Sequence, residues 1–97
     1  MYITQAALRD RFNALNLGEK LRKGEVSLRI LKEWDAPPSL GFPDGSKSQL
    51  VSYVGADGKQ FATAHRYRAP DGTLLASGRA DPKTLREGDT LYQIQRV

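Results

Sequence analysis

The stretch from His65 to Lys83, HRYRAPDGTLLASGRADPK, holds the residues with the clearest chemical potential in this chain. His65 is the only histidine, and histidine is the side chain that titrates unaided near neutral pH. Tyr67 lies two residues further on, and Lys83 could stabilise negative charge that develops on a phosphate. These three residues suggest a metal-independent ribonuclease site with His65 as general acid or base.

The same stretch is the most basic part of the chain. From His65 to Arg86 there are five basic and two acidic side chains, a net +3 out of +4 for the whole sequence. Such a patch attracts phosphate backbones, although a few extra arginines also serve solubility. The predicted nucleic-acid-binding residues are Arg66, Arg68, Arg79, Lys83 and Tyr53.

A hairpin is expected to position these residues. Segments 49–55 and 60–69 flank Asp57-Gly58, a strong signal for a two-residue hairpin turn. That turn pairs Val54 with Phe61, Leu50 with His65 and Gln49 with Arg66. One face then carries Phe61, His65 and Tyr67, and the opposite face carries Arg66, Arg68, Tyr53 and small alanines. Basic side chains beside an aromatic ring on an open sheet are typical of single-stranded nucleic acid binders.

The first half of the chain predicts two helices and one strand. Thr4 is a good N-cap for a helix to about Leu15, and a second helical turn over 19–23 ends at Gly24. Alternating residues predict a half-buried strand over 26–34. The loop 35–46 has three prolines and two glycines, and we expect Leu40 and Phe42 to be tucked into it.

After the hairpin, Pro70-Asp71-Gly72 predicts a tight turn into a return strand over 73–77, with Leu75 near Tyr67. Asp81 is expected to cap a short helical turn that begins at Pro82. A last strand covers 91–94. The sum is an α+β fold, with two N-terminal helices packed on an antiparallel sheet of about five strands in meander order.

Composition limits the protein class. Ninety-seven residues make one domain, 1–97, with a helical part over 1–24 and a mainly antiparallel sheet over 25–97. The apolar fraction of 39 % is too high for a disordered chain, and the absence of cysteine excludes a disulfide scaffold or a zinc ribbon. Without an apolar run that could span a bilayer or act as a signal peptide, we expect a cytoplasmic protein.

Cofactor sites are not indicated. Asp44, Asp57 and Asp71 each precede a glycine, so their simplest role is turn formation rather than metal binding. We find no phosphate-binding loop and no nucleotide-binding glycine fingerprint. The sequence therefore predicts neither a metal nor a cofactor.

The segment HRYRAPDGTLLASGRADPKTL, followed by GDTLY, resembles a segment of small uncharacterised bacterial proteins. The resemblance covers about the last third of the chain and implies no role for any residue. In size and basicity the chain is also similar to small ribonuclease toxins of the RelE kind, but it has no matching motif.

The leading hypothesis is a non-enzymatic binding module of bacterial or phage type. Its basic C-terminal sheet would contact RNA, another single-stranded nucleic acid, or an acidic protein partner. A first alternative is the small ribonuclease that uses His65. A second is a structural protein–protein interaction domain that pairs through an exposed edge strand.

Overall fold

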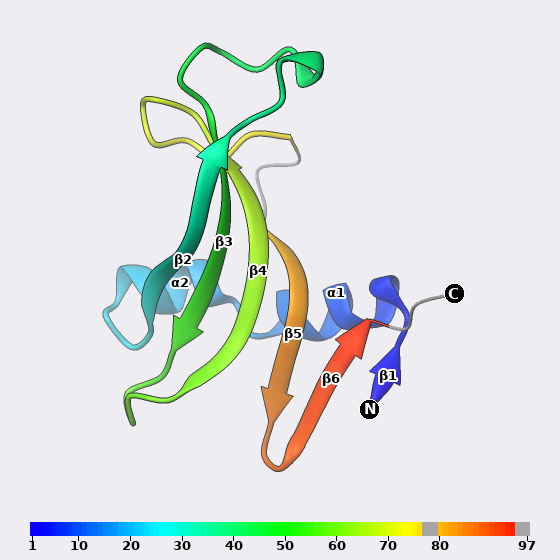
Figure 1. Cartoon of the computed structure of the whole chain (residues 1–97). Coiled ribbons are helices and arrows are strands. Elements are labelled where there is room, and N and C mark those ends of the chain that lie inside the picture. Colours follow the sequence, from blue (N-terminus) through cyan, green and yellow to red (C-terminus); the bar gives the residue numbers. More distant parts are fainter. Residues whose placement is uncertain (77–79, 95–97) are drawn as a thin grey trace.

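A computed structural model describes residues 1–76 and 80–94 (Figure 1). It is an α+β fold with two helices and one six-stranded mixed sheet in the order β1-β6-β5-β4-β3-β2. The helices are α1 (Gln5–Ala14) and α2 (Leu17–Arg22). The strands are β1 (Tyr2–Ile3), β2 (Ser27–Asp35), β3 (Lys47–Val54), β4 (Gln60–Arg68), β5 (Asp81–Glu87) and β6 (Thr90–Ile94).

The predicted α+β class is confirmed, and the predicted meander is roughly matched. Strands β2 to β6 follow one another as antiparallel neighbours, but the short strand β1 adds a parallel pair with β6. Both helices lie on one side of the sheet, with α2 behind β2 and β3 and α1 reaching across β5 to β6 in the view of Figure 1. No helix in the described ranges is long and apolar enough to cross a membrane.

The N-terminal helix begins as predicted. The Thr4 hydroxyl accepts a hydrogen bond from the Ala7 amide at 3.1 Å, which satisfies one free donor of the first turn. Leu8 and Phe12 then fall on one buried face, and α1 packs against β5 and β6. A second helix, α2, is followed by Gly24 in a left-handed conformation (φ +76°).

The register of the β3–β4 hairpin is confirmed from Gln49 to Tyr53, but its turn differs from the prediction. The loop is one residue longer, closed by the bond from the Gly55 amide to the Lys59 carbonyl (3.0 Å). A bulge at Phe61 compensates, since Tyr53 pairs with Ala62 and Val54 pairs with Gln60. Phe61 therefore packs against the core and does not share the His65 face by simple alternation.

Two predictions for the segment after Arg68 are wrong. Residues 81–83 belong to strand β5 and not to a helical turn; a β4–β5 bulge beside Pro82 accommodates its missing N–H. The described part of the expected return strand over 73–77 forms only a bridge between Arg68 and Leu74. Its predicted register is nevertheless confirmed, because the Leu75 amide donates to the Tyr67 carbonyl (2.9 Å). Ser77 lies outside the described residues.

Strand β2 is far less buried than predicted. Leu28 is partly buried, but the remaining residues of the strand are exposed. The reason is its position at the edge of the sheet, where most of its length lies beyond the helices. In the following loop Phe42 is partly buried and packs on Tyr67, as expected. The same expectation is wrong for Leu40, which is exposed.

Candidate functional site

The alanine-bearing face of β4 is the core of the protein and not an open platform. Ala62 and Ala64 are buried with Leu85 under the helices. Tyr53 on this face is only 5 % exposed, and its ring meets Phe12 edge-on with centroids 5.5 Å apart. The predicted role of Tyr53 as an exposed stacking surface is therefore wrong, because its ring stabilises the core instead.

Arg66 and Arg68 share this helix-side face, as the hairpin register predicted, but they lie beyond the part that the helices cover. Arg66 is half-buried, and its Nε donates to Gln49 Oε1 at 2.8 Å. Arg68 is exposed near Gly72. Lys83 lies in β5, the strand that pairs with β4 on the side opposite to β3. Arg79 is outside the described residues.

The opposite face of the sheet carries a row of rings, of which the sequence predicted His65 and Tyr67 together but not Trp34 or Phe42. We call Trp34, His65, Tyr67 and Phe42 the aromatic row. Successive ring centroids are 6.0 Å apart from Trp34 to His65, 4.7 Å from His65 to Tyr67, and 5.1 Å from Tyr67 to Phe42. Cross-strand pairing joins these residues, since Trp34 and Tyr67 both lie opposite Ser48.

His65 is held in place within this row. Its Nε2 lies 2.5 Å from the hydroxyl oxygen of Ser48, which is 2 % exposed. Partial burial, followed by the nearby charge of Lys83, lowers the pKa of His65 below its ordinary value, and Asp81 opposes this shift. The neutral imidazole that results is suited to bond Ser48 and to present a ring face.

Asp81 lies opposite His65 in the β4–β5 pair, but its carboxylate is bound elsewhere. It accepts hydrogen bonds from Gln5 Nε2 (2.7 Å), Arg9 (3.3 Å) and Lys83 Nζ (3.3 Å). Burial raises the pKa of Asp81, but the bonds and charges of Arg9 and Lys83 outweigh it and leave a lowered pKa. Asp81 thus fastens β5 to α1 and does not orient His65.

Basic side chains surround the aromatic row. Residues that face each other across a sheet share one side of it, which places Arg29 and Lys32 of β2 on the same face as His65. Arg86, opposite Leu91, lies on this face of β5. Lys83 is close enough to affect the pKa of His65. This face is therefore both aromatic and positively charged.

Of the predicted residues, the structure brings His65, Tyr67 and Lys83 together and separates them from Arg66, Arg68 and Tyr53. The sequence missed Trp34 because a bulge in β2 changes its side-chain alternation. Within the described residues no group of three or more His, Asp or Glu side chains is arranged to hold a metal ion.

Comparison with known proteins gives no relative for this arrangement. No protein-family model matches the chain, and no curated protein and no solved structure is significantly similar to it.

Proposed function

We propose that the chain is a non-enzymatic binding module whose aromatic face binds single-stranded nucleic acid. The observation that supports this most is the aromatic row, with Arg29, Lys32 and Arg86 on the same face and Lys83 near His65. Figure 1 shows that the helices cover only the other face of the sheet. Sheets that bind single strands combine exposed rings, on which bases stack, with basic side chains that follow the phosphates.

The solvent exposure of each ring in the aromatic row decides whether a base could stack on it. Trp34 is 46 % exposed and lies at the outer end of the row, so a base could stack on it without displacing other side chains. Tyr67 is partly exposed between His65 and Phe42. His65 and Phe42 then act mainly as supports that fix the orientation of Tyr67, which reduces the entropy lost on binding.

A ribonuclease remains the second candidate, because His65 and Tyr67 share a face and Lys83 is close enough to affect the pKa of His65. Against it, the Nε2 atom that would exchange a proton with substrate is already bonded to the buried Ser48 hydroxyl. The geometry therefore favours His65 as a supporting ring over His65 as a general base.

Pairing of β2 with a second sheet is less well supported. Although the strand is nine residues long, a bulge near Leu31 interrupts its regular pattern, and Arg29, Lys32 and Glu33 place charge along it. Bulges and charged side chains are the usual features that prevent edge-to-edge association.

Trp34 provides a direct test because it is the only tryptophan in the sequence. We expect a single-stranded oligonucleotide of about 12 nucleotides, within the site sizes of sheet-based binders, to quench its fluorescence in a saturable manner. Tyr67→Ala should weaken binding at least several-fold, since stacking on one ring contributes about 1–3 kcal/mol. Arg66→Gln, on the other face, is the matched control.

The same titration, run with EDTA and followed on a denaturing gel, separates the alternatives. Cleavage that disappears in His65→Ala would replace the binding proposal with the ribonuclease. Absence of quenching with both RNA and DNA strands would refute the proposal and favour an acidic protein partner.

A further inference from the structure

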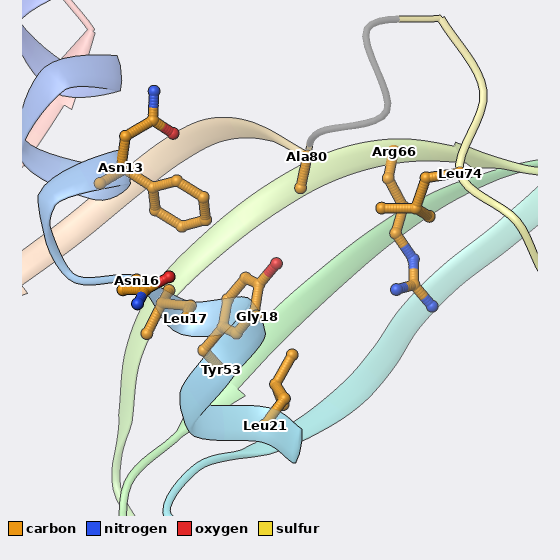
Figure 2. Close-up of a pocket in the computed structure, with 10 residues that line it drawn as sticks. Asn13, Asn16, Leu17, Gly18, Leu21, Tyr53, Arg66, Leu74 and Ala80 are labelled. Atoms are coloured by element: carbon orange, nitrogen blue, oxygen red, sulfur yellow. The ribbon is translucent and has the colours of Figure 1, made fainter. Parts of the chain in front are cut away.

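The helix-side face holds a pocket that the proposed nucleic-acid interface does not use. It lies between α1, α2 and the sheet and has a volume of about 320 Å³. Its lining includes the apolar side chains of Phe12, Leu17 and Leu21. Figure 2 shows Tyr53 near Leu17 and Leu21, and Arg66 at the opposite end of the pocket. Asn13 and Asn16 lie among the remaining lining residues.

Arg66 is fixed at the end of this pocket. Its Nε donates to Gln49, and the fully buried Gln49 side chain in turn donates to the Glu33 carboxylate. This chain of bonds holds the guanidinium plane, and within residues 1–76 and 80–94 its two terminal nitrogens have no hydrogen-bond partner. Figure 2 shows the guanidinium at one end of the pocket, with open space between it and the side chains of Leu21 and Tyr53.

The charge of Arg66 lacks a counter-ion in the described part of the chain. No Asp or Glu oxygen there lies within 4.0 Å of its guanidinium, whereas Arg9, Arg11 and Arg22 all have such partners. Arg66 is half-buried, and this partial desolvation of its positive charge lowers its pKa. A half-buried guanidinium without an anion is costly unless a ligand supplies one.

We propose that this pocket binds a small organic carboxylate with a compact apolar body. The carboxylate would accept two parallel hydrogen bonds from the terminal nitrogens of Arg66, the geometry in which arginine binds such groups most strongly. The apolar body would lie against Phe12, Leu17 and Leu21. The Tyr53 hydroxyl, which Figure 2 shows directed into the same space, offers a third donor.

The dimensions of the pocket narrow the ligand class. About 320 Å³ is at the lower end of the range for small-molecule sites, so a long fatty acid or a nucleotide would not fit inside. Because the Arg66 guanidinium is the one positive group among the described residues that line the pocket, a ligand with a single negative charge is favoured. An aromatic or branched acid of about ten heavy atoms meets both limits.

Benzoate is the probe for the test, with two matched controls. Benzamide keeps the ring without the charge, and acetate keeps the charge without the ring. In ¹⁵N-labelled protein, we expect benzoate to shift the Arg66 Nε–Hε signal in a saturable manner, with a Kd of about 1 mM that suits so small a ligand. Benzamide and acetate should bind at least tenfold more weakly.

Variants assign the site. Arg66→Gln should abolish the benzoate-dependent shifts of the Tyr53 ring signals, and Arg66→Lys, which retains charge without the planar fork, should weaken them. Arg68→Gln, an exposed arginine on the same strand and face, should leave them unchanged. Equal binding of benzoate and benzamide, retention of binding in Arg66→Gln, or no saturable shift up to about 20 mM would overturn the proposal.

This inference does not depend on the proposed nucleic-acid interface. The two sites lie on opposite faces of the sheet, so oligonucleotide binding should persist in Arg66→Gln while benzoate binding is lost. The reverse pattern is expected for Tyr67→Ala.

Discussion

The salt dependence of nucleic-acid binding should distinguish the two faces of the sheet. Three basic side chains lie on the aromatic face, Arg29, Lys32 and Arg86, and a fourth, Lys83, lies near His65 and is paired with Asp81. If each neutralises one phosphate of a single strand, the slope of log affinity against log salt is at most about −2.8, or −0.7 per contact. Raising the salt from about 50 to 200 mM would then lower affinity about 50-fold.

The double change Arg29→Gln with Lys32→Gln removes two of these contacts. The slope should fall to about −1.4, and the same rise in salt should cost only about sevenfold in affinity. Both side chains lie on the exposed strand β2, so the change should leave the fold intact. Fluorescence anisotropy of a labelled single strand at four or more salt concentrations would give both slopes.

The control is Arg66→Gln with Arg68→Gln on the helix-side face. We expect its slope to equal that of the unmodified protein, because neither guanidinium lies on the aromatic face. If this control flattens the slope and the β2 variant does not, the wrong face has been assigned. If the slope is near zero for all three proteins, phosphate contacts do not drive binding.

Two further predictions concern stability. Leu85→Ala should cost about 2–5 kcal/mol and lower Tm by roughly 10–25 °C for a domain of this size, because Leu85 is 0 % exposed. The partly exposed Leu91→Ala should change Tm much less, and equal losses would contradict the assigned core. The pKa of His65 in the folded protein is below its ordinary value of 6.5, so the folded state binds the proton less readily than the unfolded state. The contribution of neutral His65 to stability is therefore complete above about pH 6.5 and is lost as the pH falls through the pKa of the folded state. Thermal melts between pH 7 and 5 should therefore show a smaller loss of Tm for His65→Gln than for the unmodified protein; a larger loss would contradict this.

The pairing of β3 with β4 could be read from the sequence because Asp57-Gly58 limits where the chain can reverse. The predicted turn was one residue too short, yet the register survived because the bulge at Phe61 absorbs the added residue. Local turn chemistry gave the position of the hairpin. The bulge depends on how the hairpin packs, and no residue type in the sequence indicates it.

The side of the sheet that the helices cover could not be read from the sequence. Alternation correctly placed His65 and Arg66 on opposite faces. Ala62 and Ala64 suggested a bare platform, whereas small residues here allow the helices to approach the strand closely. The candidate stacking ring was therefore assigned to Tyr53, which is buried, and not to Trp34.

Trp34 was missed for a specific geometric reason. In a regular strand, Ile30 and Trp34 would point to the same side because they are four residues apart. In the structure Ile30 lies opposite Val51 of the core face, while Trp34 lies opposite Ser48 of the aromatic face, since the bulge between them inserts one residue. Similarly, Pro82 favoured a helix start, and only the adjacent bulge made a strand possible.

The lengths of the strands and helices explain why a polar network lies next to the core on the helix-side face of the sheet. The nine residues of β4 extend about 30 Å, whereas the six residues of α2 extend about 9 Å, so the helix cannot cover the strand. The remaining surface must carry polar groups, which Glu33, Gln49 and Arg66 supply. If this surface only had to keep the protein soluble, exposed and fully hydrated lysine side chains would be enough. A half-buried guanidinium held by a fully buried glutamine goes beyond that need, and it is the feature from which we infer an anionic ligand.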